Sequence, residues 1–242
     1  MKQLIKIVLC GIVLLSGTTI AQAVTLAELL DDGSITAGDK LFDDWELLDY
    51  ESSQPDRSFN YGNIVVTPLN DGGLDPGPGL TFDILNQELW VTADENLAFV
   101  DLLLGFRVSV LDPGLQIVDG SLGGLDGSIS YSMDGDNDVG FYIHETIGTF
   151  PWDDGLGVNE TEFSVLNGTE TEDTTATAGF EPQNAIWVTQ NIRVWATDTD
   201  TARLNSFDQR FSQTQTVVPE PSTFALMFLG LAGLFVARNR KN

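Results

Sequence analysis

Apolar and polar residues alternate through the middle of the chain, and this pattern predicts β-strands. The longest alternating run covers residues 99–111, in which every second side chain is apolar. Because successive side chains of a strand point to opposite faces, these apolar groups all lie on one side. They are Val100, Leu102, Leu104, Phe106, Val108 and Val110. The run therefore predicts a long strand with one face buried in a core.

Shorter runs of β-branched and aromatic residues continue the pattern, separated by Gly, Pro, Asn and Asp clusters. We expect further strands at residues 59–67, 80–92 with a change of phase near 86–87, 116–119, 162–166, 185–196 and 207–217. Residues 168–179 are rich in Thr, Glu and Ala and are predicted to form a loop. About nine short strands with turn signals between them are typical of an antiparallel β-sandwich, jelly-roll-like or Ig-like.

One pair of strands is expected to form a hairpin around residues 134–138. Ile129, Tyr131 and Met133 lead into this turn, and Val139, Phe141 and Ile143 lead out of it. Placing Met133 opposite Val139 puts all six apolar side chains on one face of the pair. The pattern thus predicts a hairpin whose apolar face covers the core.

Helices are expected only near the two ends of the chain. Thr25 and Glu28 have the spacing of a capping box, which predicts a helix of two turns that Gly33 ends. A second, hydrophobic helix is expected in the uncharged run 224–237. The predicted fold is therefore an all-β sandwich with a short N-terminal helix and a C-terminal hydrophobic helix.

The first 23 residues are typical of a cleavable secretory signal peptide. Lys2 and Lys6 form a positively charged n-region, and residues 7–15 form a mainly apolar h-region. Ala21 and Ala23 supply the small-x-small pattern that signal peptidase accepts. We expect the Sec translocon to export the chain and signal peptidase to cut after Ala23.

The composition of the mature chain excludes several classes of site. Cys10 is the only cysteine and leaves with the signal, which removes disulfides, thiolate metal sites and cysteine nucleophiles together. Residues 24–218 contain 35 acidic side chains and six basic ones, a formal charge of −29. Such a surface repels nucleic acids and anionic lipids, because both carry negative charge. We therefore expect no nucleic-acid partner.

The C-terminal end combines a proline motif, an apolar run and a basic cluster. Pro219, Glu220 and Pro221 are followed by the uncharged run 224–237 and then by Arg238, Arg240 and Lys241. As a helix the run would rise only about 21 Å at about 1.5 Å per residue, against a hydrocarbon core of about 30 Å. The basic cluster stays in the cytoplasm by the positive-inside rule. This arrangement predicts a transient hold in the inner membrane rather than a permanent anchor.

This tail resembles the PEP-CTERM sorting signal of Gram-negative bacteria that make exopolysaccharide. The resemblance rests on the Pro219-Glu220-Pro221 triplet, the short apolar run and the terminal basic cluster. It implies that an exosortase-like enzyme recognises and cuts the tail, after which the protein reaches the cell surface or the extracellular space. The chain then divides into a signal peptide at 1–23, an acidic β-sandwich at 24–218 and a sorting tail at 219–242.

Three stretches of the ectodomain resemble a recurring PEP-CTERM ectodomain of unassigned function. They cover residues 33–42, 110–114 and 207–213, with the sequences GSITAGDKLF, VLDPG and FDQRFSQ. The resemblance implies a shared fold and no shared chemistry.

Carboxylates in the expected turn suggest a calcium site. Asp134, Asp136 and Asp138, with Glu145 at the twelfth position, imitate the ligand spacing of an EF-hand. Val139 stands where that loop needs Gly, and in a hairpin Glu145 would lie about 23 Å from Asp138 at about 3.3 Å per residue. We therefore reject an EF-hand and keep two alternatives, a looser Ca²⁺ site made by the three aspartates or an ordinary solvated turn. No other cofactor is expected.

The sequence carries no recognisable catalytic motif. His144 is the only histidine, and its position in the alternation places it on the face opposite Phe141 and Ile143, where it is exposed. There is no Gly-x-Ser-x-Gly elbow, no His-Glu-x-x-His and no phosphate loop. Paired carboxylates could cleave a glycoside, but nothing in the sequence selects one pair among so many. We expect a protein that is not an enzyme.

Two tryptophans lie on the polar face of the strand at 185–196. Ile186, Val188, Ile192 and Val194 share one face, whereas Trp187 and Trp195 share the other with Thr189, Asn191 and Arg193. Exposed indoles among polar neighbours can stack on sugar rings, but a neighbouring loop or sheet could also cover them. Both interpretations remain open from the sequence.

These features predict an exported, exosortase-processed protein of the cell envelope or extracellular matrix with a structural or adhesive role. The alternative is a carbohydrate-binding module for exopolysaccharide, which requires Trp187 and Trp195 to be accessible. A glycan-active enzyme is a third alternative, and it would need two facing carboxylates beside a sugar-sized pocket.

Changing Glu220 to Ala should block processing of the tail but leave export and membrane insertion unchanged, because the apolar run is unaltered. The wild type and this variant would be fractionated in a host with an exosortase and in one without it. We expect the wild type to be shortened and released only in the first host, and the variant to stay membrane-bound in both. A wild type that stays full length in both hosts would mean that the tail is an ordinary anchor.

Overall fold

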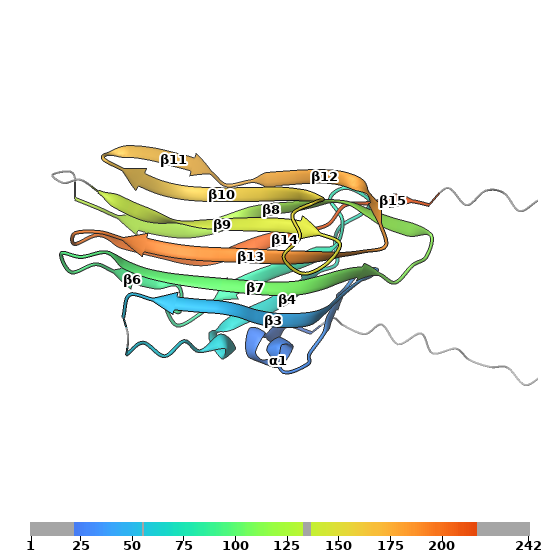
Figure 1. Cartoon of the computed structure of the whole chain (residues 1–242), viewed down its shortest axis with the longest axis horizontal. Coiled ribbons are helices and arrows are strands. Elements are labelled where there is room, and N and C mark those ends of the chain that lie inside the picture. The colour runs from blue at the N-terminus through green and yellow to red at the C-terminus, as the bar shows by residue number, and fades with distance from the viewer. Residues whose placement is uncertain (1–21, 55, 133–136, 217–242) are drawn as a thin grey trace, which may run out of the picture.

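Two antiparallel β-sheets stack face to face and make up nearly all of the described chain (Figure 1). This computed structural model describes residues 22–216, except residue 55 and residues 133–136. The predicted all-β class with two antiparallel sheets is confirmed. The start of the signal peptide and the whole sorting tail lie outside the described residues.

The first sheet has the strand order β1-β4-β5-β14-β8-β12, and in addition β6 pairs with β14 and β15 pairs with β8. Its strands are β1 (Val24–Thr25), β4 (Ile64–Leu69), β5 (Gly79–Ile84), β6 (Trp90–Thr92), β8 (Leu115–Ser130), β12 (Ala176–Gln183), β14 (Thr201–Arg210) and β15 (Gln213–Gln215). Apart from β4 and β5, neighbours in this order are far apart in sequence, so that the sheet joins the beginning, middle and end of the domain.

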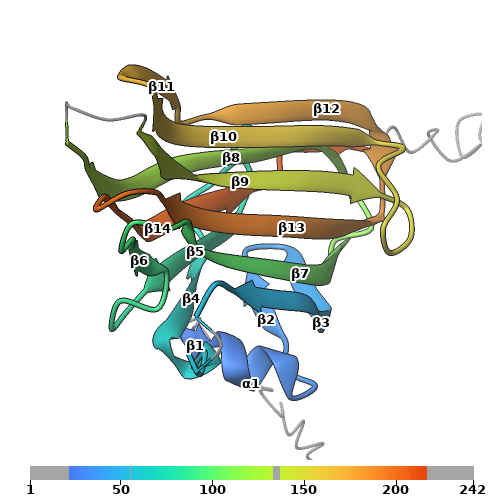
Figure 2. The same ribbon diagram turned by 60° about the vertical axis from the view of Figure 1, so that its left-hand side comes forward.

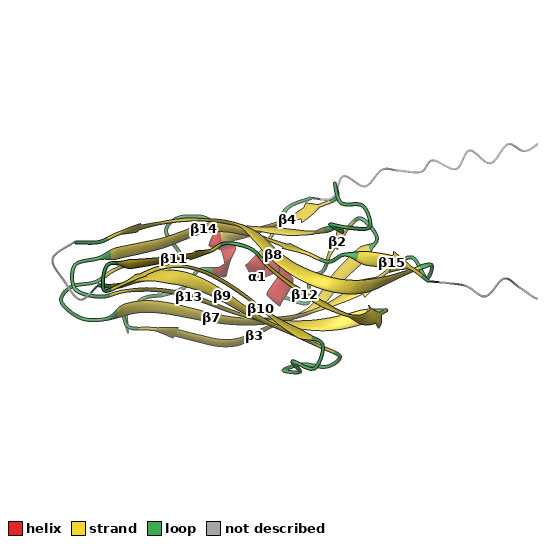
Figure 3. Cartoon of the chain, turned by 90° about the horizontal axis from the view of Figure 1, so that it is seen from above, coloured by secondary structure: helices red, strands yellow, loops and turns green. Residues whose placement is uncertain are grey.

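The second sheet has the strand order β11-β10-β9-β13-β7-β3-β2. Its strands are β2 (Ile35–Ala37), β3 (Lys40–Ser52), β7 (Ala98–Val110), β9 (Asp138–Gly148), β10 (Gly157–Leu166), β11 (Thr169–Asp173) and β13 (Ala185–Ala196). Figure 3 shows the two sheets edge-on, with the only helical segments of the described chain in red.

The helix α1 (Leu26–Leu30) begins with a complete capping box. The Thr25 hydroxyl accepts the Glu28 backbone N–H, and the Glu28 carboxylate accepts the Thr25 backbone N–H at 2.8 Å. The helix has five residues, so it is shorter than the two turns that the sequence predicts. The described residues also include a 3-10 turn, η1 (Tyr61–Asn63), and neither helix is long and apolar enough to cross a membrane.

The apolar faces of both sheets meet in one core. The predicted buried face of residues 99–111 is confirmed for five of its six apolar side chains, because those from Val100 to Val108 are fully buried, whereas Val110 is partly buried. Aromatic rings join the two layers: the ring of Trp45 in β3 lies 6.3 Å from that of Phe82 in β5. Burying each such side chain contributes about 1.5–3 kcal/mol, and this supplies most of the stability of a domain without disulfides.

The predicted hairpin around residues 134–138 is wrong. β8 and β9 belong to different sheets, because β8 pairs with β14 and β12 whereas β9 pairs with β10 and β13. The chain therefore crosses from one layer to the other at this point. The alternation cannot separate the two cases, since strands of facing sheets also point their apolar residues at one shared core. Met133 lies outside the described residues.

One other expectation about strands is wrong, and one long strand is not predicted. Residues 168–179 are not a loop, because β11 and the start of β12 occupy them. The sequence also gives no sign of β3, whose thirteen residues pair with β7 along its length. Two register shifts, between Asp43 and Glu46 and between Leu47 and Asp49, interrupt its alternation and hide the strand.

A polar cluster around Glu145 is buried between the two sheets. The Glu145 carboxylate accepts amide N–H groups from Asn159 at 2.9 Å, from Gln190 at 3.1 Å and from Gln209 at 3.3 Å. Asn159 also donates to the Gly120 carbonyl. Because Gln209 and Gly120 belong to the first sheet and the other three to the second, these bonds tie the two layers together.

Burial raises the pKa of Glu145 from about 4.5 to about 7, because the charged form loses its hydration, although the three amide donors oppose this shift. Glu145 is wholly buried. Between these two pH values the folded chain keeps a proton that the unfolded chain has released. Stability therefore falls as the pH rises from about 4.5 to about 7 and stays at the lower level above that range.

Changing Glu145 to Gln should remove this pH dependence. The new amide can donate to the side-chain oxygens of Asn159 and Gln190, which have no hydrogen-bond partner among the described residues. Relative to the wild type, we expect the variant to gain on the order of 3 kcal/mol between pH 5 and pH 8 in urea unfolding. Glu170→Gln, at an exposed position of β11, is the control and should show no such gain. An equal pH profile for the wild type and Glu145→Gln would contradict the assignment.

Candidate functional site

The outer face of the second sheet carries aligned rows of polar and aromatic side chains. Five neighbouring strands, β10, β9, β13, β7 and β3, run side by side across this face (Figure 2). One row consists of Glu162, Tyr142, Arg193, Asp101 and Glu51, and the next of Glu160, His144, Asn191, Leu103 and Asp49. We call this surface the outer face.

Trp195 lies at one end of the outer face beside a hollow of about 470 Å³. The hollow is lined by Tyr142, His144, Glu160, Glu162, Asn191 and Trp195. The indole N–H of Trp195 donates to the Asp138 carboxylate at 2.6 Å, and its ring lies 5.8 Å from the Tyr142 ring. These two contacts fix the orientation of a half-buried indole whose remaining surface borders the hollow.

His144 lines the hollow beside Trp195 and contacts Glu160 on the neighbouring strand. Its Nδ1 lies 2.9 Å from the Glu160 carboxylate, and the two side chains are 40% and 58% exposed, which agrees with the outward position that the sequence predicts for His144. The contact becomes an ion pair only when the imidazole is protonated. Glu160 and Glu162 place further carboxylate oxygens along the rim.

The middle of the outer face is held by a network of charged and amide groups. The Asn191 amide donates to the Asp101 carboxylate at 2.5 Å, and the Arg193 guanidinium lies 5.3 Å from the centre of the Phe99 ring. Desolvation by burial raises the pKa of Asp101, and the Asn191 hydrogen bond opposes this shift. Burial likewise raises the pKa of the Tyr142 hydroxyl. Asp49 and Glu51 complete a smaller hollow of about 180 Å³.

Trp187 lies at the opposite end of the outer face beside a second large hollow, of about 480 Å³. Its wall includes four acidic residues, Asp32, Asp43, Asp44 and Glu46. Arg107, from the neighbouring strand, donates two hydrogen bonds to Asp43 and lies 3.2 Å from the Asp44 carboxylate. The hydrogen bond with Asp43 is the main cause of a raised pKa at Arg107.

The two predicted tryptophans therefore share one strand and one face. They are separated by eight residues, which is about 26 Å at about 3.3 Å per residue. Each is half-buried, so neither is fully covered by a neighbouring element. Each also borders a hollow, of about 480 Å³ at Trp187 and of about 470 Å³ at Trp195.

The predicted calcium ligands are only partly described. Asp134 and Asp136 lie outside the described residues, and the Asp138 carboxylate already accepts the Trp195 indole N–H. Glu145 points into the core and is wholly buried, away from that loop, which agrees with the rejection of an EF-hand. Within residues 22–132 and 137–216, apart from residue 55, no three acidic or histidine side chains are grouped to hold a metal ion. A calcium site at the loop remains a prediction.

Three residues beside Trp195 could not be assigned to the site from the sequence. Tyr142, Glu160 and Glu162 come from β9 and β10, and only the register of these strands against β13 brings them to Trp195. The available signal was the alternation of β9, which places Tyr142 and His144 on the face opposite Phe141. Assigning them to the site of Trp195 required the strand order as well.

The described domain belongs to the class of acidic all-β sandwich domains, and a sorting signal follows it in the sequence. Residues 217–241 match the PEP-CTERM protein-sorting motif, which confirms the resemblance found in the tail. The chain is therefore an exosortase substrate, and this implies that the protein is exported. The predicted motif residues Pro219, Glu220 and Pro221 and the basic flank of Arg238, Arg240 and Lys241 all fall within the match.

Several solved structures resemble the chain at low identity, and no curated protein is detectably similar to it in sequence. One is a mannan-recognising carbohydrate-binding module, TmCBM27, with 9% identity, a TM-score of 0.32 and coverage of 81% of this chain and 97% of that chain. A second is TmCBM61 in complex with β-1,4-galactotriose, with 12% identity, a TM-score of 0.24 and coverage of 72% and 89%. A third is a xylan-binding domain of Paenibacillus barcinonensis Xyn10C, with 11% identity, a TM-score of 0.22 and coverage of 73% and 97%.

Proposed function

We propose that this protein is an adhesive component of the cell envelope or extracellular matrix that holds polysaccharide on its outer face. The observation that carries the proposal is the pair Trp187 and Trp195, which lie on one face of β13 with an accessible hollow beside each indole. This combines the adhesive role with the carbohydrate-binding alternative, since the binding of a polymer is what makes such a protein adhesive.

The chemistry of the hollows suits a sugar. An indole offers an apolar ring face that can cover the C–H face of a pyranose, and its N–H is already paired in Trp195. Carboxylate and amide oxygens at the rim can accept hydrogen bonds from sugar hydroxyls, and the Asn191 and His144 nitrogens can donate. Aromatic anchors with a few polar groups around them are typical of small-molecule sites.

The spacing of the tryptophans favours a polymer over a single sugar. Two stacking points about 26 Å apart on one rigid strand can engage one extended chain at both ends. Two linked contacts then gain affinity, because the second forms at high effective concentration. The outer face also carries more carboxylates than cations, so it favours a neutral polysaccharide over an anionic one.

Binding rather than catalysis is what we propose for the outer face. Its carboxylates line the rims of shallow hollows, and the buried Glu145 is sealed inside the core where no substrate can reach it. After export, the exosortase substrate motif would deliver this domain to the cell surface or the extracellular space, where polysaccharide is available as its partner.

Replacing Trp195 or Trp187 by Ala should weaken binding to the exopolysaccharide of the native host. We expect roughly a tenfold loss for each variant, which corresponds to about 1.4 kcal/mol, and a larger loss for the double variant. The measurement is affinity electrophoresis in gels containing that polysaccharide, with mannan, xylan and alginate as reference polymers.

Trp152→Ala is the matched control, because Trp152 is 59% exposed and lies outside the strands of the outer face. It should bind as the wild type does. Thermal unfolding of all variants would verify that they fold. If the double variant folds and is retarded as strongly as the wild type, the outer face is not the binding site and the proposed function fails.

A further inference from the structure

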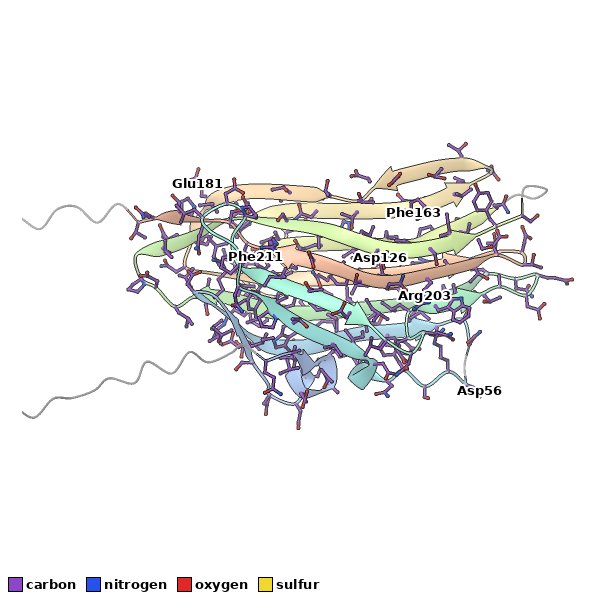
Figure 4. All side chains as sticks on the ribbon, turned by 180° about the vertical axis from the view of Figure 1, so that it is seen from behind. Asp56, Asp126, Phe163, Glu181, Arg203 and Phe211 are labelled. Carbon is purple, nitrogen blue, oxygen red and sulfur yellow. The ribbon has the colours of Figure 1, made fainter. Side chains whose placement is uncertain are left out.

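The three stretches that resemble other PEP-CTERM ectodomains meet at one place in the fold. Lys40, from the first stretch, pairs with Val110 from the second. The Phe42 ring lies 5.9 Å from the ring of Phe211, which belongs to the third. Figure 4 labels Phe211 toward one end of the sandwich and Asp56 at the other. Residues separated by most of the domain in sequence therefore form one cluster.

Lys40 is the unusual member of this cluster, because its side chain is completely buried. Lysine is almost never fully buried unless its ammonium is paired. Its Nζ lies 3.3 Å from the Asp39 carboxylate and donates to the side-chain oxygen of Gln213. Desolvation lowers the pKa of Lys40, while the charges of Asp39 and Asp119 oppose this shift. Burial thus favours the neutral amine, which is the nucleophilic form.

The Gln213 side chain is held firmly against Lys40. Its amide nitrogen donates to the Gly73 carbonyl at 3.1 Å, and its backbone N–H donates to the Leu74 carbonyl at 2.8 Å. It also pairs with Ile117 in the first sheet. The Gln213 carboxamide is therefore held in hydrogen-bond contact with the Lys40 amine, and an intramolecular reaction requires such proximity.

Asp39 is the carboxylate that lies next to the Lys40 amine. One of its oxygens contacts the Lys40 Nζ, and the other is buried with no hydrogen-bond partner among the described residues. Gly38 sets this position, because it has a positive φ of 56° in the turn between β2 and β3. A Cβ at Gly38 would also lie 2.6 Å from Pro78.

We propose that Lys40 and Gln213 become joined by an intramolecular isopeptide bond. The neutral Lys40 Nζ attacks the carboxamide carbon of Gln213, so that an N–C bond forms. Asp39 takes a proton from Nζ and delivers it to the amide nitrogen of Gln213. The bond from that nitrogen to the carbon then breaks, and one molecule of ammonia leaves. The reaction exchanges one amide for another and requires no oxidant, reductant or cofactor.

Such a bond goes beyond polysaccharide binding and would stabilise the domain against force. It would connect the start of β3 in the second sheet to β15 in the first. β15 has only three residues and directly precedes the sorting motif, so tension on the C-terminal end would otherwise detach this strand first. A cross-link that closes a long loop also lowers the conformational entropy of the unfolded chain. A disulfide stabilises cysteine-containing proteins in the same way.

The test is peptide mapping of the mature protein purified from its native host and digested with trypsin under denaturing conditions. Lys40 is the only lysine between residues 7 and 240, so cleavage after it is easily followed. We expect trypsin not to cut after Lys40. We also expect one joined species that contains Lys40 and Gln213, lighter than the two separate peptides together by one ammonia.

Two variants complete the experiment. Gln213→Leu keeps the approximate shape but has no carboxamide, so its digest should contain a freely cleaved Lys40 peptide and no joined species. Asp39→Asn removes the proton carrier and should slow formation, leaving a mixture of joined and free peptides. If wild-type digests contain only the free Lys40 and Gln213 peptides, these residues form a hydrogen bond alone and the proposal is wrong. The peptide map is independent of polysaccharide binding, so each proposal can fail without the other.

Discussion

The strict alternation of side chains along β13 ties the core to the candidate binding face. Its even-numbered apolar residues are buried against the first sheet, and this packing fixes the rotation of the strand. Trp187 and Trp195 must then point to the outer face, because they lie on the opposite side of β13 from the buried residues. The length of strand between them fixes their separation. A slip of one residue in register would bury both indoles and expose the core face, so the same packing energy that holds the sandwich together also holds the geometry of the outer face.

Long regular strands could be predicted from sequence, and crossings between layers could not. Residues 99–111 and 185–196 keep a clean alternation because each strand has one buried and one polar face. The alternation around residues 129–143 predicts a hairpin that does not form, since strands from two facing sheets show the same pattern as paired strands. β3 cannot be predicted from the alternation, because its two bulges change the phase of the pattern within thirteen residues. The sheet to which β9 belongs and the existence of β3 both depend on pairing between distant segments. The local pattern of apolar and polar residues carries no information about that pairing.

The same distinction applies to the candidate site: some of its residues can be predicted from their own strand, and others only from the pairing of distant strands. The two tryptophans could be found from their own strand, but Tyr142 and Glu160 reach Trp195 only through the pairing of β9 with β13 and β10. The burial of Glu145 can be predicted from its own strand, because it lies on the same face of β9 as Phe141 and Ile143. Its role in joining the sheets depends on Gln190 and Gln209, which contact it from opposite sheets.

The few basic residues of this acidic domain are placed where separate segments must be joined. Arg107 neutralises the carboxylates at the bulge of β3, and Arg210 links β14 to Asp71 at 2.9 Å. Arg57 donates to the backbone carbonyls of Trp90 and Glu88 and so fixes the loop before β4. Cations used in this way compensate only the carboxylates next to them, and the remaining acidic groups stay at the surface. The outer face is therefore negatively charged because the few cations of the domain are used in contacts between separate segments.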